Sequence, residues 1–263
     1  MNATITYQRK EKKGKVRTIT TYNDNLAGQE LKQKHLQYKD ELYAIFEQNK
    51  TDYTYAYQKD FNVKKMVEQH LNSNYFLKVD IHSFFDNIYC ERLINKIPQD
   101  KVNDNLISII LECSGGKDKG IAIGFIPSPI LANIYLAEFD KILGSYLAEL
   151  GNIVYTRYAD DLIISSQAEF NLDDVLNFIQ KLLAQDKLFL NKSKIQKVTL
   201  DKVGSHIKIT GLNIIKGRYS NYISVSRKFK KKANLETNKK RKRIRKGYIK
   251  YNEHRDDKGQ HKV

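Results

Sequence analysis

The most informative hydrophobic pattern is a set of short apolar runs that end beside acidic residues. Residues 75–80, Tyr-Phe-Leu-Lys-Val-Asp, form a run that is typical of a buried strand ending in a carboxylate. Residues 153–158 and 162–166 are rich in β-branched and aromatic side chains, and the short connection between them contains Asp160 and Asp161. This arrangement predicts a β-hairpin with two adjacent acids at its tip.

Other segments show the periodicity of helices. In residues 171–185 the Leu, Val and Ile side chains fall on one helical face, which predicts an amphipathic helix with a structural role. Ser128 and Pro129 predict the start of another helix, with Ser as the capping residue and Pro in the first turn, and this helix should run to about Leu150. Further helices are expected at 26–48 and 103–113.

The remaining β-rich runs complete a mixed pattern. Strands are expected near residues 18–21, 188–190, 206–215 and 222–225. From about Arg227 onward the sequence predicts a basic helix or a partly ordered tail. Strands and helices are interleaved without an internal repeat or a Pro- or Ser-rich linker, so we expect an α+β layer fold.

Composition is that of a globular chain. The 263 residues are 41% hydrophobic and 11% aromatic, which is enough for a substantial core. The longest apolar stretch, residues 121–136, is interrupted by Gly and Pro, and the N-terminus lacks the layout of a signal peptide. Cys90 and Cys113 lack metal-ligand spacing and suit a reducing compartment. We therefore expect a cytoplasmic protein without a membrane partner.

The charge points to a polyanionic partner. The formal net charge is +16, and Lys and Arg cluster in residues 9–17 and 227–250. Such a surplus favours nucleic-acid binding, although a merely soluble basic protein or a nuclear-import signal would also fit the basic runs. The candidate nucleic-acid-binding residues are Arg227, Lys228, Lys230, Lys231, Lys239, Lys240, Arg241, Arg243 and Arg245.

Three carboxylates at strand or hairpin ends carry the candidate chemistry: Asp80, Asp160 and Asp161. Adjacent acids beside apolar strands are unfavourable unless a cation binds there. Mg²⁺ prefers carboxylate oxygens, and two such ions about 3.5–4 Å apart can clamp the attacking and leaving oxygens in phosphoryl transfer. An isolated Asp-Asp pair is more often an ordinary solvated turn, so the interpretation depends on its context.

That context is a series of motifs. Tyr158-Ala159-Asp160-Asp161 resembles the Tyr-x-Asp-Asp hairpin of reverse transcriptases, and residues 76–88 resemble the family's first acidic motif, in which two aromatic residues follow Asp four and five positions later. Residues 120–136 resemble the template and nucleotide loop with its following helix. Residues 14–17, 190–194 and 209–214 resemble further family segments, in the family's order. The resemblance spans about residues 9–235. Within the family, the chain is most similar in kind to compact bacterial enzymes of the retron or antiphage-defence type.

The resemblance implies a right-hand polymerase fold of the α+β class. Fingers would occupy residues 1–73, the palm 74–225 with a fingers-like insertion around 92–125, and a short or truncated thumb or basic RNA-binding tail 226–263. It implies an RNA-directed DNA polymerase that uses two Mg²⁺ ions, with Mn²⁺ as an alternative. Expected partners are an RNA template or structured non-coding RNA, dNTPs, the DNA product, and a second protein or another copy of the chain that could complete the thumb.

The resemblance also assigns roles to individual residues. Asp80, Asp160 and Asp161 would be the catalytic metal ligands, and the backbone carbonyl of Ile81 a further one. The aromatic ring of Phe85 would exclude a 2′-hydroxyl from the sugar site, unless Phe85 is simply a core residue, as Phe84 is expected to be. The expected nucleotide-binding residues are Lys15, Arg17, Phe85, Gly124 and Lys194, where the cations would pair with phosphate and Gly124 would allow close backbone approach.

The match departs from the family in two places. Ala122-Ile123 and Phe125-Ile126 replace the usual Pro-Gln and Ser-Pro beside the loop glycine, which makes the nucleotide pocket more apolar. His70 lies ten residues before Asp80, as in retron enzymes, but Met66-Val67 replace the accompanying Asn-Ala. The alternatives are therefore a template-independent or RNA-synthesising polymerase of the same fold, and a non-catalytic RNA-binding protein.

Overall fold

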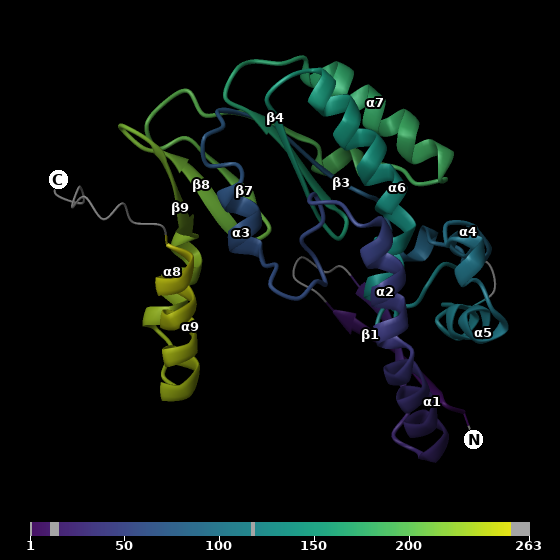
Figure 1. Cartoon of the computed structure of the whole chain (residues 1–263). Coiled ribbons are helices and arrows are strands. Elements are labelled where there is room, and N and C mark those ends of the chain that lie inside the picture. Colours follow the sequence, from purple (N-terminus) through teal and green to yellow (C-terminus); the bar gives the residue numbers. More distant parts are fainter. Residues whose placement is uncertain (1, 11–15, 117–118, 254–263) are drawn as a thin grey trace.

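The computed structural model describes residues 2–10, 16–116 and 119–253, and within them the strands form three separate antiparallel sheets (Figure 1). The first is a hairpin of β1 (Thr4–Lys10) and β2 (Val16–Tyr22). The second has the order β4-β5-β3-β6, and the third the order β7-β8-β9. This interleaved arrangement of helices and antiparallel sheets confirms the predicted α+β class.

The central sheet contains the strands that the sequence predicted most clearly. β3 covers Tyr75–Asp80, and the hairpin consists of β4 (Ile153–Tyr158) and β5 (Asp161–Ser166). The edge strand β6 (Gln196–Thr199) pairs with β3 and was not predicted, since its polar, half-exposed side chains give no apolar run. The two acidic segments therefore belong to neighbouring strands of one sheet.

Both faces of this sheet are buried, and the strand pleat separates them. Leu77 and Leu162 belong to the main core, which lies under the long helix α6 (Ser128–Glu149) and α7 (Leu172–Gln185). These two helices run side by side over the sheet (Figure 1). Phe76 and Ile163 point the opposite way into a second core. Burial on both faces explains why β3 and β5 read as nearly continuous apolar runs.

The second core joins the central sheet to the third sheet. The third sheet consists of β7 (His206–Ile209), β8 (Leu212–Lys216) and β9 (Asn221–Val225). Alternate residues such as Ile207, Ile214 and Ile223 are almost fully buried in this core. The third sheet is thereby fixed next to the β4–β5 hairpin.

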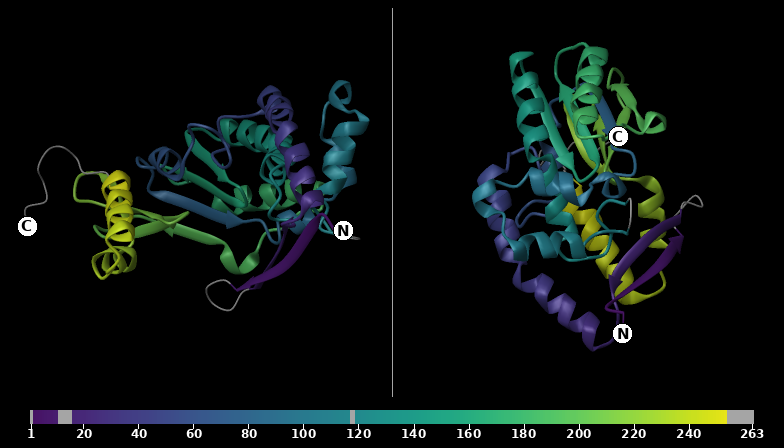
Figure 2. Two further views of the ribbon diagram at one scale, coloured as in Figure 1. Left: turned by 90° about the horizontal axis from the view of Figure 1, so that it is seen from below. Right: turned by 90° about the vertical axis from the view of Figure 1, so that its right-hand side faces the viewer.

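The remaining helices surround these sheets, as two further views show (Figure 2). The two basic C-terminal helices, α8 and α9, lie against the third sheet on the opposite side of the molecule from α4 and α5 (Figures 1 and 2). Their bounds are α1 Leu26–Gln37, α2 Lys39–Asn49, α3 Val63–Glu68, α4 Cys90–Asn95, α5 Asp104–Glu112, α8 Arg227–Asn234 and α9 Lys239–Asn252. Short 3₁₀ helices occur at Phe85–Asn87, Gln99–Lys101 and Lys192–Lys194.

Three local predictions were wrong. The helix expected at 26–48 is two helices, because Tyr38 ends α1 and caps α2, and its ring packs against the core. Helix α6 begins at Ser128 with Pro129 in its first turn and ends at Glu149, as predicted, but the capping role of Ser128 was wrong, because Pro127 occupies the cap position. Residues 188–190 form only an isolated bridge, Ile81 to Leu190, because the chain turns into a 3₁₀ helix at Lys192.

Among the described residues, no helix combines the length and apolar character that crossing a membrane requires.

Candidate active site

The predicted catalytic acids lie together where the end of β3 meets the β4–β5 hairpin. The pairing of β3 with β5 places Asp80 directly opposite Asp161. The backbone N–H of Ile81 donates a hydrogen bond of 2.9 Å to the carbonyl oxygen of Asp160. The strand register therefore brings three acids that are distant along the chain to one end of the central sheet, as the sequence predicted.

The hairpin turn has an unusual backbone conformation that the protein supports from within. Ala159 has a φ of 56°, in the left-handed region that residues with a side chain seldom adopt. Its carbonyl oxygen accepts a hydrogen bond of 3.1 Å from Nη1 of Arg157. Backbone conformations of this kind persist only where the surroundings hold them, and they cluster at functional sites.

Arg157 belongs to a fully buried ion pair that the sequence analysis missed. Its Nη2 lies 2.6 Å from Oδ2 of Asp140 on α6, and both side chains are fully buried. The hydroxyls of Tyr155 and Thr54 donate hydrogen bonds to the same carboxylate. The sequence did contain a signal for this pair: Arg157 stands in a β-rich run and Asp140 in an apolar helix. Charged side chains are rarely fully buried unless they are paired, so two charges in apolar segments could have suggested an ion pair.

The crowding of carboxylates disfavours negative charge on Asp160. Burial, reinforced by the charges of Asp80 and Asp161, raises the pKa of Asp160 from 3.8 to about 6, and Lys194 opposes this only in part. A divalent cation beside these groups would favour their ionised forms. The electrostatics of the site therefore fit a bound cation.

Nearby groups of the protein partly balance the other two acids. Nζ of Lys194 lies 2.6 Å from Oδ2 of Asp80. Nζ of Lys78 lies 3.7 Å from Oδ1 of Asp161, and the hydroxyl of Thr210 donates to Oδ2 of the same residue at 3.2 Å. Lys194, predicted to lie near the leaving phosphate, is thus within reach of the acids.

The donor atoms suit a hard divalent ion, although the side chains are not arranged around one. In the described parts of the chain, no group of three or more His, Cys, Asp or Glu side chains is disposed to hold a metal ion. The N–H of Ile81 faces Asp160, and in a strand the carbonyl of the same residue points to the same side. Carboxylates together with a carbonyl oxygen are typical ligands of Mg²⁺ and Mn²⁺.

The two aromatic residues after Asp80 have different environments. Phe84 is only 4% exposed and belongs to the main core, as expected. Phe85 is half-buried at the start of a 3₁₀ helix and packs edge-to-face on Phe84 with ring centroids 5.4 Å apart. Part of the Phe85 ring therefore remains exposed, and its contact with a nucleotide sugar stays a prediction.

Gly124 is required by the protein's own packing. Its φ is 129°, and a Cβ atom at this position would lie 2.5 Å from the carbonyl oxygen of Thr20 on β2. The N–H of Thr20 also donates to the carbonyl of Ile123 at 3.0 Å. The glycine thus lets the loop join the β1–β2 hairpin, and the predicted nucleotide contact of Gly124 remains untested.

One of the two predicted phosphate-binding cations lies on the β1–β2 hairpin. Lys15 falls outside the described residues, whereas Arg17 is the second residue of β2. Tyr57, which the sequence analysis missed, lies within electrostatic range of both Arg17 and Asp160: burial raises the pKa of Tyr57, Asp160 raises it further, and Arg17 opposes the increase. The role of Arg17 in binding phosphate remains a prediction.

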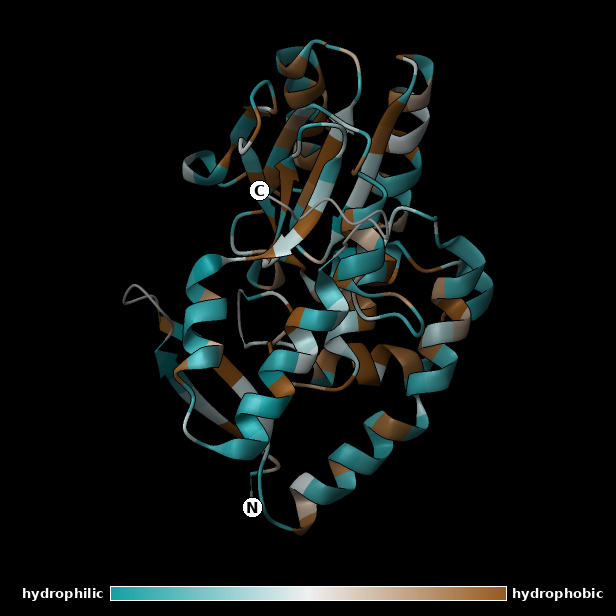
Figure 3. Ribbon diagram, turned by 90° about the vertical axis from the view of Figure 1, so that its left-hand side faces the viewer, coloured by the Kyte–Doolittle hydropathy of each residue, from teal (hydrophilic) through white to brown (hydrophobic). Residues whose placement is uncertain are grey.

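The predicted nucleic-acid-binding residues all belong to α8 and α9. Both helices are strongly hydrophilic along their length (Figure 3). Two of these cations, Lys230 and Arg245, form ion pairs with Glu253 and Glu236. Tyr248 on α9 packs on Phe229 of α8 with ring centroids 5.3 Å apart, and its pKa is raised by burial and by the charge of Tyr158.

Comparison with known proteins identifies this arrangement. Residues 8–245 match the model of the family described as reverse transcriptase (RNA-dependent DNA polymerase). The chain belongs to the reverse transcriptase family. Relatives from Escherichia coli include the retron Ec73 reverse transcriptase, 29% identical over 200 residues that cover 69% of this chain and 60% of the relative. The retron Ec86 reverse transcriptase is 24% identical over 162 residues, which cover 62% and 49%.

Solved reverse transcriptase structures show the same fold. Telomerase from Candida albicans, in complex with the TWJ fragment of telomeric RNA, has a TM-score of 0.57 at 12% identity, covering 85% of this chain and 46% of that one. Apo telomerase from Candida tropicalis has a TM-score of 0.56 at 13% identity, covering 80% and 46%. The fold is the right-hand polymerase fold expected from the sequence. The chain spans about half the length of the curated relatives it matches.

Proposed function

We propose that this chain is an RNA-directed DNA polymerase whose acids Asp80, Asp160 and Asp161 hold two divalent ions, Mg²⁺ or Mn²⁺. The observation that supports this most is the β3–β5 register, which sets Asp80 opposite Asp161 with Asp160 at the adjoining bend. Members of the reverse transcriptase family generally use divalent ions. Bound ions would stabilise the attacking 3′-oxygen and the leaving pyrophosphate during nucleotide transfer.

The protein's own residues would position the substrates around the acids. Lys194, now beside Asp80, would turn to the pyrophosphate, since a lysine ammonium binds phosphate oxygens as a point charge. Arg17 would approach the triphosphate from β2, and Lys15 is expected to bind the triphosphate as well. The exposed part of Phe85 would lie against the deoxyribose and disfavour a ribose.

The rest of the chain would hold the nucleic acid. We infer fingers in residues 1–73, a palm in 74–225 with an insertion around 92–125, and a basic thumb or RNA-binding segment in 226–263. Helices α8 and α9 would bind the backbone of the template duplex or of a structured non-coding RNA. A second protein or another copy of the chain would complete this nucleic-acid-binding surface. We infer a cytoplasmic bacterial enzyme with a role in antiphage defence, because its curated relatives are retron reverse transcriptases.

Primer extension tests this proposal directly. A DNA primer annealed to an RNA template is incubated with dNTPs and Mg²⁺ or Mn²⁺, using the wild type, Asp160→Asn and Asp201→Asn. Asp201 is an exposed acid that follows β6 at the end of β3 opposite to Asp80, so its variant is the matched control. The wild type and the control should extend the primer, and Asp160→Asn should not. Equal extension by the wild type and Asp160→Asn would contradict the proposal.

A further inference from the structure

The third sheet has one buried face and one open face with different chemistry. The buried face carries Ile207, Ile214 and Ile223. On the open face the register forms two cross-strand rows. The residues of these rows are His206, Ile215 and Tyr222 in one, and Lys208, Asn213 and Ser224 in the other. The open face points away from the central sheet, because the opposite face forms the shared core.

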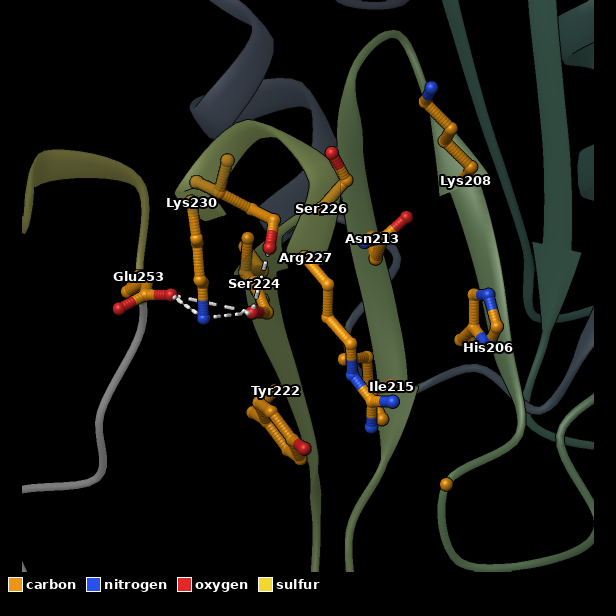
Figure 4. A pocket seen from close by; sticks show the side chains of 13 residues that line it. His206, Lys208, Asn213, Ile215, Tyr222, Ser224, Ser226, Arg227, Lys230 and Glu253 are labelled. Atoms are coloured by element: carbon orange, nitrogen blue, oxygen red, sulfur yellow. Dashed lines mark hydrogen bonds and ion pairs between the residues drawn. The ribbon is translucent and has the colours of Figure 1, made fainter. Parts of the chain in front are cut away.

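This open face is hollowed and bordered by the C-terminal helices. A cavity of about 880 Å³ lies over both rows, and Arg227 and Lys230 of α8 and Glu253 after α9 also line it. The close-up shows Lys208, His206 and Arg227 on the same side of the sheet (Figure 4). A sheet surface of this shape can accept an extended chain along the strands.

The charge of the cavity is positive. Lys208, Arg227 and Lys230 line it together with His206, and Glu253 is the acid among the lining residues. Glu253 is already paired with Lys230. A surplus of cations in a groove favours a polyanion over a protein segment of mixed charge.

The floor of the cavity offers hydrogen-bonding groups and rings. Asn213 is 9% exposed, and it lines the cavity from the middle strand, β8. Its amide offers both a hydrogen-bond donor and an acceptor to a ligand in the cavity. Tyr222 and His206 supply rings in the neighbouring row, and aromatic rings beside cations are the usual platform for unstacked bases.

We propose that the open face of β7–β9 binds single-stranded RNA at a site separate from the catalytic acids. Lys208 and Arg227 bind backbone phosphates, and His206 and Tyr222 stack on bases. Asn213 bonds to a 2′-hydroxyl, the group that distinguishes RNA from DNA. In the β7–β8 turn the hydroxyl of Thr210 donates a hydrogen bond to Asp161, and the proposed site does not include this turn. The site shares Arg227 of α8 with the nucleic-acid surface of the proposed function, and RNA binding without metal or nucleotide distinguishes it from polymerase activity.

Fluorescence anisotropy with a labelled single-stranded RNA, in the absence of divalent metal, tests the site. Lys208→Glu changes one exposed side chain and leaves the buried face intact, so folding should be unaffected. This variant should bind RNA at least about tenfold more weakly and show a smaller dependence on salt, by about 0.7 log unit for each phosphate that is no longer neutralised. Tyr222→Leu should weaken binding by about five- to tenfold, because leucine offers no ring for stacking. Lys181→Gln, an exposed cation on α7, is the matched control and should bind like the wild type.

Two further measurements complete the test. DNA of the same sequence should bind more weakly than RNA to the wild type, and Asn213→Leu should reduce this difference. Extension of a short primer already annealed to its template should be unchanged in Lys208→Glu, because the duplex does not need the open face. Wild-type RNA affinity in both Lys208→Glu and Tyr222→Leu would overturn the proposal, as would equal affinity of the wild type for RNA and DNA.

Discussion

Replacing Asp160 with Asn should stabilise the metal-free protein. The pKa of Asp160 is raised from 3.8 to about 6 by burial and by the charges of Asp80 and Asp161. An acid whose pKa is higher in the folded than in the unfolded protein binds its proton more tightly in the fold, so its ionised form is destabilising. Asn has nearly the same shape and carries no charge. The variant therefore removes the repulsion while keeping the packing.

The size of this effect follows from the pKa of Asp160. A rise in the pKa of Asp160 from 3.8 to about 6 means that the unfolding free energy of the protein is about 3 kcal/mol lower when Asp160 is ionised than when it is protonated. This cost is absent below pH 3.8, grows as the pH rises, and is complete above about pH 6. At pH 8 we expect Asp160→Asn to exceed the wild type in unfolding free energy by about 2 to 3 kcal/mol, and at pH 3.5 by about zero.

Urea denaturation at a series of pH values, followed by circular dichroism in EDTA, measures the difference. Asp201→Asn is the control and should show no such dependence, because this acid is exposed and away from the site. Adding Mg²⁺ at pH 8 should stabilise the wild type and have less effect on Asp160→Asn, since a ligand stabilises the state that binds it. A wild type as stable as Asp160→Asn at pH 8 in EDTA would refute the reasoning.

Three further variants test other parts of the account. Phe85→Ala should raise ribonucleotide incorporation relative to deoxynucleotide incorporation in primer extension. An unchanged ratio would show that the Phe85 ring does not exclude ribonucleotides. Arg157→Leu should cost about 3 to 5 kcal/mol in urea denaturation, because it leaves the buried carboxylate of Asp140 unpaired; a destabilisation below about 1 kcal/mol would contradict this. Replacing the four α9 cations Lys239, Lys240, Arg241 and Arg243 with Gln should lower the salt dependence of duplex binding by about 0.9 log unit for each phosphate that is no longer neutralised, and an unchanged slope would exclude α9 from the interface.

The parts of the fold predicted well from sequence are those where local pattern and tertiary packing agree. β3 and the hairpin were predicted nearly residue by residue, because burial on both faces of the central sheet leaves continuous apolar runs. The helix expected at 26–48 was wrong because the break at Tyr38 has no Pro or Gly signal. The ring of Tyr38 at this break packs against the core, an interaction that local sequence does not encode.

The convergence of the three acids could be predicted from the sequence, but the contacts that hold the hairpin turn beside them could not. Motif order indicated Asp80, Asp160 and Asp161, and the strand register brings them together. The pairing of Arg157 with Asp140 could not be foreseen, since it joins two elements whose contact depends on the complete fold. Gly124 was predicted for nucleotide approach, whereas the structure shows a steric reason of its own, the carbonyl of Thr20. The nucleotide and nucleic-acid contacts remain predictions.

The central claim is that Asp80, Asp160 and Asp161 jointly hold divalent cations. Titration with Mn²⁺, in which electron paramagnetic resonance counts the free ion, measures this directly in the presence of primer, template and a nucleotide that cannot be incorporated. We expect two bound Mn²⁺ ions per chain in the wild type and in the control Asp201→Asn. In both Asp80→Asn and Asp160→Asn, fewer Mn²⁺ ions should bind, or they should bind more weakly. Wild-type stoichiometry and affinity in both acid variants would contradict the central claim.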